Sequence, residues 1–206
     1  MTLLIDPWTF PEPSTPFDDG AAVRTLVLGG GCFWCTEAVY VELAGVTRVR
    51  PGYASDSLAK ADYRTVCSGT TNHAEVIEIT YQPPVIPLGR LLKLFFAIAH
   101  DPTQKNRQGA DVGRQYRSVV FYSSEAERLY ITQYMAEIAQ ARLFSAPLAT
   151  TVEPLEAFYA AEPEHHGYAR RNPGSPYIRA VSDPKVAKLR KTHAPLLAPA
   201  PTGQRS

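Results

Sequence analysis

Residues 23–37, VRTLVLGGGCFWCTE, decide the fold of this chain. The first part, 23–28, is short and rich in leucine and β-branched residues, which predicts a strand. Three consecutive glycines then permit a tight turn, because glycine takes positive φ values without a steric cost. The run 33–44 contains neither glycine nor proline and stops at Gly45, which predicts a helix. A strand, a glycine turn and a helix therefore begin the domain.

Cys32 stands at the start of the predicted helix. Unsatisfied N–H groups and the positive end of the helix dipole favour a thiolate there, and a thiolate is the nucleophilic form of cysteine. Cys35 follows three residues later on the same helix face, within reach for disulfide exchange. The pattern predicts a nucleophilic Cys32 with a second thiol beside it. The alternative is a buried cysteine that only fills space after a glycine turn.

Composition limits the classes of function. The chain has 206 residues, is 45% hydrophobic and carries a net charge of +1, which suits one globular domain with extensions. The basic residues form no dense block, so we expect no nucleic-acid partner. No apolar run is long enough to span a membrane, and the N-terminus lacks a basic region before an apolar one. We therefore expect a cytoplasmic protein, and an odd number of cysteines agrees with that location.

The segment His73–Tyr81, HAEVIEITY, alternates as a strand does. Val76, Glu78 and Thr80 fall on one face, whereas Glu75 shares the other with Ile77, Ile79 and Tyr81. A carboxyl group among apolar neighbours has its ionised form disfavoured, which raises its pKa toward neutrality. Glu75 is therefore a candidate proton donor, unless it lies at a solvated strand end.

The rest of the chain supplies further elements and one long polar connection. Patterns predict a helix over 88–99, a strand over 117–122, a helix from Ser124 to about 142, and a short strand near 150–152. Residues 100–116 contain a single aliphatic residue, Val112, and such a long polar loop in a compact domain is usually functional.

These elements predict an α/β (α+β) fold, a two-layer sandwich with a mixed sheet and flanking helices. Irregular extensions are expected at both ends. We divide the chain into a proline-rich N-terminal arm, 1–21, a catalytic domain, 22–192, and a C-terminal tail, 193–206. Three aromatic residues of the arm are expected to dock on the domain: Trp8, Phe10 and Phe17.

The chemistry suggested by these residues is attack of a thiol on a centre whose oxygen leaves as water. Cys32 is the candidate nucleophile and Glu75 the candidate acid. Phe33 and Trp34 offer an apolar wall suited to a methyl or thioether group, because sulfur–aromatic contacts are favourable. The alternative for both rings is ordinary core packing.

Two other functions fit parts of the pattern. Cys32, Cys35, Cys67 and His73 can be combined into a zinc site, but a single Cys-x-x-Cys lacks the second pair that is typical of structural zinc. A thiol-disulfide oxidoreductase of the thioredoxin type also opens with Cys-x-x-Cys after a strand. Trp34, however, lies between the two cysteines and not before them, and that class gives Glu75 no role.

The chain resembles the A-type peptide methionine sulfoxide reductases over roughly residues 24–172. The matching stretches are GGGCFWCTE, PGYA, YRTVCSGTTNHAEVIEITYQP, HDPTQKNRQGADVGRQYRSVVFY and, more weakly, FYAAEPEHHGY. The first, third and fourth are long and specific. The resemblance implies the same two-layer α/β domain that the local patterns predict.

The resemblance also implies roles for individual residues. Cys32 would attack the sulfoxide sulfur and become a sulfenic acid while methionine is released. Phe33 and Trp34 would hold the ε-methyl group. The oxygen would be protonated by Glu75 and hydrogen-bonded by two tyrosines, with an aspartate supporting the site: Tyr63, Tyr116 and Asp111. The implied substrate is the S epimer, free or in proteins, with no metal or organic cofactor and with thioredoxin or a related dithiol as reductant.

The chain departs from the family in its remaining cysteines. Many relatives resolve the sulfenic acid with a cysteine in a C-terminal tail, whereas no cysteine follows Cys67 here. Cys35 stands where glycine is frequent. We predict that Cys35 attacks the sulfenic acid on Cys32 and that thioredoxin reduces the resulting disulfide, with Cys67 as the alternative resolving residue. We expect a monomer.

Overall fold

The computed structural model describes residues 9–18 and 20–199, and a six-stranded mixed sheet forms its centre. The strand order is β7-β6-β1-β3-β2-β8, with β6 and β7 parallel and the other pairs antiparallel. The strands are β1 (Arg24–Gly30), β2 (Val46–Ala54), β3 (Ala74–Tyr81), β6 (Ser118–Tyr122), β7 (Thr151–Pro154) and β8 (Phe158–Ala160). The predicted fold class is confirmed.

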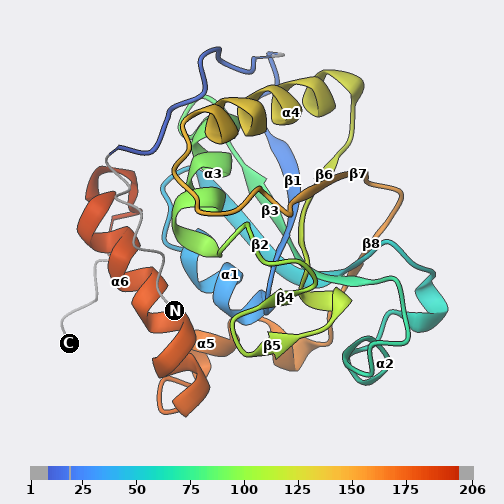
Figure 1. Ribbon diagram of the computed structural model, residues 1–206. Coiled ribbons are helices and arrows are strands. Elements are labelled where there is room, and N and C mark those ends of the chain that lie inside the picture. Colours follow the sequence, from blue (N-terminus) through green and yellow to red (C-terminus); the bar gives the residue numbers. More distant parts are fainter. Residues whose placement is uncertain (1–8, 19, 200–206) are drawn as a thin grey trace, which may run out of the picture.

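Helices cover the sheet and one another (Figure 1). They are α1 (Phe33–Tyr40), α2 (Tyr63–Cys67), α3 (Leu88–Leu94), α4 (Glu125–Gln140), α5 (Tyr168–Arg171) and α6 (Asp183–Thr192). Helix α1 packs against β1, β2 and β3, while α4 packs against β6 and β7. Helix α6 lies on α1 and on η2 (Phe95–Ala99), a π-helical turn that continues α3. A second π-helical segment, η5 (Ile178–Ser182), leads into α6.

The strand–turn–helix prediction at the start of the domain is confirmed, with a shorter helix. Gly31 has φ of 87°, and a Cβ there would lie 2.7 Å from the side chain of Gln108. This position therefore needs glycine both for its backbone and for space. Helix α1 ends at Tyr40, four residues before the predicted end at 44. The turn after Gly31 brings Cys32 to the helix start.

The predicted alternation of β3 is confirmed and places a carboxyl group in the core. Glu75, Ile77, Ile79 and Tyr81 are all buried. Val76, on the other face, is also buried, because a smaller apolar cluster covers that side of the sheet. Glu75 is therefore at a covered strand end, and the alternative of a solvated carboxyl is wrong.

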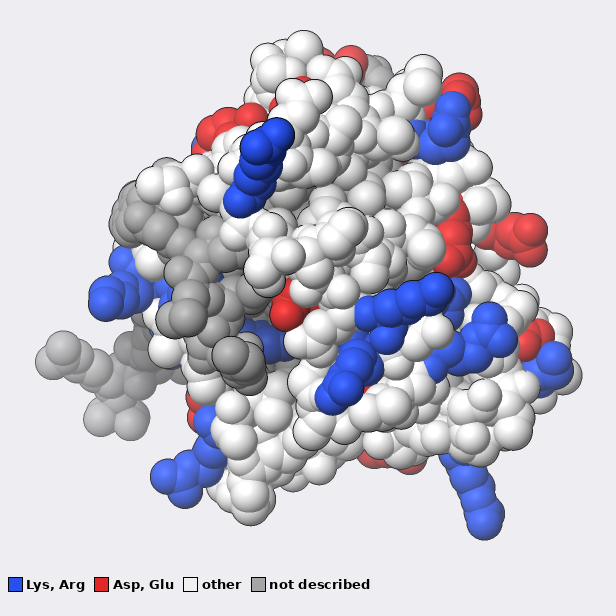
Figure 2. Space-filling view, viewed as in Figure 1, with Lys and Arg blue, Asp and Glu red and all other residues white. Residues whose placement is uncertain are grey.

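The long polar connection 100–116 contains a hairpin of two short strands, β4 (Arg107–Gln108) and β5 (Asp111–Val112), followed by a 3-10 turn, η3 (Arg114–Tyr116). Arg107 pairs with Val112, and Gln108 pairs with Asp111. Figure 2 shows Lys and Arg atoms gathered on the face that carries this hairpin, where Lys105, Arg107 and Arg114 are exposed. The hairpin thus fixes the place of Asp111, which is paired with Gln108.

The end segments lie against the domain as far as the structure describes them. Phe10 is 2% exposed and packs on Phe144, while Phe17 packs on Tyr130. Docking of these two rings is confirmed, and Trp8 lies outside the described residues. Leu197, assigned from the sequence to the tail, forms a bridge with Leu43. The domain limits themselves stay a prediction.

No helix in residues 9–18 and 20–199 is long and apolar enough to cross a membrane.

Candidate active site

Two free thiols meet at the first turn of α1. Cys32 is the N-cap residue, and its carbonyl oxygen accepts a hydrogen bond from the backbone N–H of Cys35 at 3.1 Å. The Cys32 and Cys35 side chains are also hydrogen-bonded to each other. Their exposed fractions are 7% and 1%. The expected pairing of the two thiols on one helical turn is confirmed.

The two thiols differ in acidity. Burial raises the pKa of the Cys32 thiol, and its hydrogen bond to Cys35 acts in the same direction. The same hydrogen bond lowers the pKa of Cys35 to about 7. A dipole at the start of an eight-residue helix does not overcome the burial of Cys32. Burial thus opposes ionisation of Cys32, whereas its neighbour Cys35 ionises more readily; the nucleophilic role of Cys32 stays a prediction.

Glu75 lies directly behind the cysteine turn. Its Oε2 accepts a hydrogen bond from the backbone N–H of Phe33 at 3.0 Å, and its side chain is buried. Burial raises the pKa of this carboxyl to about 8. Glu75 therefore holds a proton near neutral pH. Its carboxyl group lies at the backbone of Phe33, the residue after Cys32, where a general acid would have to be.

Tyr63 and Tyr116 enclose the same carboxyl group from two other elements. Tyr63 opens α2 and Tyr116 ends η3, and both side chains are within hydrogen-bonding reach of the Cys67 thiol. Cys67 Sγ donates to Glu75 Oε1 at 3.8 Å. Burial raises the pKa of both tyrosines, so each keeps its hydroxyl proton. Cys67, which is half-buried, thus belongs to the cluster and is not a remote core residue.

Aromatic rings form one wall of the site. Phe33 is fully buried, whereas Trp34 is half-buried and stacks on Tyr168 with ring centroids 3.8 Å apart. The indole Nε1–H of Trp34 donates to Nδ1 of His165 at 3.2 Å, and Tyr63 stacks on the same imidazole. These contacts fix the plane of the indole ring. The wall can accept an apolar group such as a thioether methyl.

The wall is attached to α1 by Glu37. Both carboxylate oxygens of this buried residue accept the backbone N–H of Gly167 at 2.9 Å. Gly167 has φ of 63° and is the N-cap of α5, which begins with Tyr168. The position of the Tyr168 ring is therefore set from the same helix that carries the cysteines.

Asp111 reaches the cysteines through Tyr177. The Tyr177 hydroxyl donates to Asp111 Oδ2 at 2.6 Å, and the Cys35 thiol donates to the Tyr177 oxygen at 3.8 Å. Tyr177 also lies within hydrogen-bonding reach of Cys32 and meets Trp34 edge-on. The sequence carried no signal for Tyr177, which follows a turn-rich NPGSP stretch. His165 and Tyr168 lie in FYAAEPEHHGY, but no pattern there indicated their contacts.

The four residues considered for zinc do not come together. His73 Nε2 is hydrogen-bonded to the carbonyl of Ser57 at 3.0 Å, while the Cys67 thiol faces Glu75. Within the described part of the chain, no group of three or more His, Cys, Asp or Glu residues could hold a metal ion.

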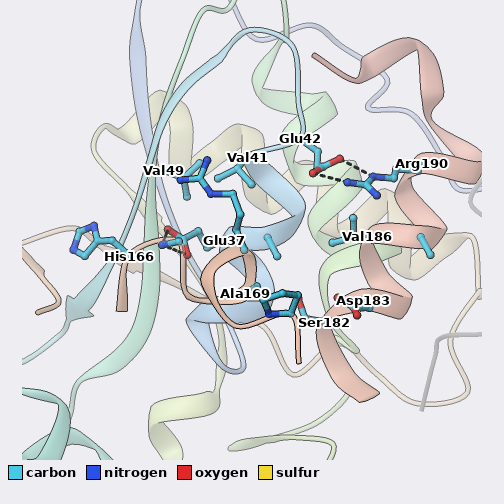
Figure 3. A pocket seen from close by; sticks show the side chains of 15 residues that line it. Glu37, Val41, Glu42, Val49, His166, Ala169, Ser182, Asp183, Val186 and Arg190 are labelled. Atoms are coloured by element: carbon cyan, nitrogen blue, oxygen red, sulfur yellow. Dashed lines mark hydrogen bonds and ion pairs between the residues drawn. The ribbon is translucent and has the colours of Figure 1, made fainter. Parts of the chain in front are cut away.

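A large cavity lies elsewhere, between α1, α6 and the loop around Gly167 (Figure 3). It measures about 920 Å³ and contains neither cysteine. Glu37, Val41 and Val186 line it, and Glu42 pairs with Arg190 at its rim. Because the reactive groups are on the other side of α1, we assign the chemistry to the cysteine turn and not to this cavity.

A mixed α/β domain that holds two hydrogen-bonded thiols beside a protonated carboxyl group defines a thiol-dependent oxidoreductase. Comparison with known proteins identifies the family within this class of oxidoreductases. The family model described as "Peptide methionine sulfoxide reductase" matches residues 24–196. The chain belongs to this family and is an enzyme.

Individual relatives agree. Peptide methionine sulfoxide reductase MsrA of Granulibacter bethesdensis is 51% identical over 169 residues, which are 82% of this chain and 91% of the relative. The reduced form of Mxr1 from Saccharomyces cerevisiae has a TM-score of 0.70 at 36% identity and covers 79% of this chain and 92% of its own. A second structure, Mxr1 in complex with Trx2, has a TM-score of 0.50 at 29% identity and covers 75% of this chain and 91% of its own.

Proposed function

We propose that this reductase converts methionine S-sulfoxide, free or in proteins, to methionine by means of Cys32 and Glu75. The observation that carries the proposal is the hydrogen bond from the Phe33 N–H to the Glu75 carboxyl, because it holds beside Cys32 an acid whose pKa burial raises to about 8. Phe33 and Trp34 form the surface for the ε-methyl group. That surface lies next to the sulfur of Cys32 along the chain, as attack on the substrate sulfur requires.

The first half-reaction transfers one oxygen atom and two electrons. The Cys32 sulfur attacks the sulfoxide sulfur, Glu75 donates a proton to the oxygen, and Tyr63 and Tyr116 donate hydrogen bonds to it. The S–O bond of the substrate breaks, the oxygen becomes bonded to the Cys32 sulfur, and the transient S–S bond between Cys32 and the substrate breaks to release methionine. The proton of the Cys32 thiol returns to Glu75, so that one thiol and one sulfoxide give one sulfenic acid and one thioether.

We infer that Cys35 then resolves the sulfenic acid. Its thiol is hydrogen-bonded to Cys32 and its pKa is about 7, so a large fraction is thiolate at neutral pH. Attack on the Cys32 sulfur forms the Cys32–Cys35 disulfide and releases water. Cys67 is the alternative, since its thiol lies against Glu75.

The disulfide needs an external dithiol to return the enzyme to its starting state. We propose thioredoxin or a related protein as that reductant, supported by the family relation to Mxr1, which has been solved in complex with Trx2. The two thiols carry the electrons themselves, so the reaction requires no metal or organic cofactor. A reducing compartment suits three free cysteines, which supports a cytoplasmic location. All residues of the proposed site come from one chain, which supports a monomer.

One turnover without reductant tests the proposal. The protein is mixed with excess methionine S-sulfoxide, methionine is quantified, and the thiols are mapped by mass spectrometry after alkylation. We expect one methionine per chain, a Cys32–Cys35 disulfide and a free Cys67. Cys32→Ser should form no methionine.

Two matched variants separate the resolving residues. Cys35→Ser should form one methionine and stop at the sulfenic acid, whereas Cys67→Ser should still form the Cys32–Cys35 disulfide. A Cys32–Cys67 bond, or a stable sulfenic acid with Cys35 still free, contradicts the assignment of Cys35. Absence of methionine from the unmodified protein contradicts the reductase itself.

A further inference from the structure

Tyr177 is the strongest candidate among the polar groups that the proposed reaction does not yet use. Its hydroxyl lies between Cys35 Sγ at 3.8 Å and Asp111 Oδ2 at 2.6 Å. The ring is half-buried and meets Trp34 edge-on. Ile178, the next residue, is 1% exposed, so the backbone that carries Tyr177 is anchored in the core. The Tyr177 hydroxyl is therefore held in place by its two hydrogen bonds and by the buried backbone that carries the ring.

We propose that Tyr177 takes part in the resolving step. Its oxygen accepts the Cys35 thiol proton while its own hydroxyl proton passes to Asp111. The proposal rests on the proposed function, since it assumes that Cys35 attacks the sulfenic acid on Cys32. It assigns Tyr177 a role in the second half-reaction and gives Asp111 a function there as well.

The direction of the two hydrogen bonds carries this inference. A phenol has one proton, and here that proton points to Asp111. The Tyr177 oxygen is thereby left as an acceptor for the Cys35 S–H. When the thiol proton moves to the Tyr177 oxygen, the phenol proton can move to Asp111 without any change in heavy-atom positions. Burial raises the pKa of Tyr177, which disfavours a tyrosinate. The Tyr177 hydroxyl therefore carries a proton both before and after the transfer.

The step balances without another reactant. Cys35 loses its proton through Tyr177 to Asp111, and its sulfur attacks the Cys32 sulfur. The S–S bond forms, the S–O bond breaks, and the departing hydroxide takes up one proton from solvent and leaves as water. Asp111, which is only half-buried, returns its proton to solvent. One thiol and one sulfenic acid thus give one disulfide and one water.

Several charged or titratable groups face Cys35 and contribute to its pH dependence. They come from four elements besides the Tyr177 segment: Cys32 of α1, Glu75 of β3, Asp111 of β5 and Lys185 of α6. The hydrogen bond from Cys32 and the charge of Lys185 lower the pKa of Cys35, whereas burial and Asp111 raise it. Removal of the Tyr177 hydroxyl takes away the acceptor of the Cys35 S–H proton, so the resolving step should need a higher pH.

The test compares Tyr177→Phe with Tyr122→Phe in the full chain. Tyr122 is a half-buried tyrosine at the end of β6, outside the site, and serves as the control. Single turnovers with methionine S-sulfoxide are quenched at increasing times. Methionine reports the first half-reaction, and loss of two thiols reports the second. A dimedone-type probe traps any sulfenic acid.

We expect Tyr177→Phe to slow disulfide formation about ten- to a hundredfold, to accumulate sulfenic acid, and to shift the pH profile of that step upward. Methionine formation should stay within about threefold, and Tyr122→Phe should leave both steps unchanged. Asp111→Asn should slow the same step, because an amide accepts the hydrogen bond but takes no proton.

Disulfide formation in Tyr177→Phe at the unmodified rate and pH profile overturns the proposal. Equal slowing of both half-reactions also overturns it, since that result indicates a general role in the structure. Cys35→Ser separates this failure from failure of the proposed function: if Cys35→Ser still forms a disulfide at the normal rate, Cys35 is not the resolving residue, whatever Tyr177 does.

Discussion

Replacement of Glu75 by Gln should stabilise the protein at alkaline pH and change its stability little at pH 4. The glutamine side chain has nearly the same shape, and its amide oxygen can accept the hydrogen bond that Phe33 N–H donates at 3.0 Å. It cannot ionise. The variant therefore removes only the free-energy cost of an ionised carboxylate in the core.

The magnitude follows from the shift in the Glu75 pKa, which burial raises from 4.5 to about 8. In this range the folded protein binds a proton that the unfolded chain has released, so stability falls as pH rises from about 4.5 to about 8. At about 1.36 kcal/mol per pKa unit, the full loss is about 5 kcal/mol above pH 8. The unmodified protein should lose this amount between pH 4 and pH 9, and Glu75→Gln should not.

Urea unfolding of both proteins, followed by circular dichroism at pH 4, 5, 6, 7, 8 and 9, measures the difference directly. The difference in unfolding free energy should be near zero at pH 4 and grow to several kcal/mol at pH 9. Glu156→Gln, a change at an exposed carboxyl group, is the control and should give a small, flat difference. A difference for Glu75→Gln that does not change with pH refutes the buried, protonated carboxyl group.

Four further outcomes are expected. Methionine formation should decline above pH 8 as Glu75 ionises; Glu75→Ala should lose about a hundredfold or more in rate, Glu75→Gln should keep part of it, and a flat profile in the unmodified protein counts against the acid role. Alkylation of Cys35 in the resting protein should be half-maximal near pH 7, as measured by peptide mass spectrometry; a midpoint above 8.5 contradicts the hydrogen-bonded thiol pair. Trp34→Ala should raise KM for the sulfoxide about tenfold with a smaller change in kcat, because the wall stacked on Tyr168 is lost; an unchanged KM argues against that binding surface. Gly31→Ala should destabilise the protein by about 1–3 kcal/mol in thermal unfolding, since φ is 87° and Gln108 fills the space; an unchanged Tm contradicts this account of the turn.

Local patterns were sufficient where one residue type dictates the backbone or one face is buried. The glycine turn before Cys32 and the alternation around Glu75 both belong to this group. The pattern predicts a strand over 46–51, but not its continuation to Ala54, because Pro51 and Gly52 normally end a strand. In the structure β2 continues through them to Ala54, since the Pro51 carbonyl accepts the backbone N–H of Ala161 from the segment after β8. Ala161 lies more than a hundred residues after Pro51, and no local pattern indicates this pairing.

The site was predictable to the extent that it is continuous in sequence or shared with the family. Cys32, Cys35 and Phe33 lie on one turn, and Glu75 meets them across neighbouring strands. Tyr177 was missed because its role depends on a contact with Asp111, 66 residues earlier. The burial of the two thiols could not be predicted either, because it depends on elements that pack on α1 from elsewhere in the chain.

The bond between Glu37 and Gly167 has a consequence for motion. It joins the loop that carries Tyr168 to α1, so the aromatic wall and the reactive sulfur belong to one rigid body. A fluctuation that tilts this helix carries the wall with it, and the spacing between bound methyl and attacking sulfur is preserved. Motions of the surrounding loops therefore do not change the alignment of the bound methyl with the Cys32 sulfur. Only a movement between α1 and the loop that carries Tyr168 can change it.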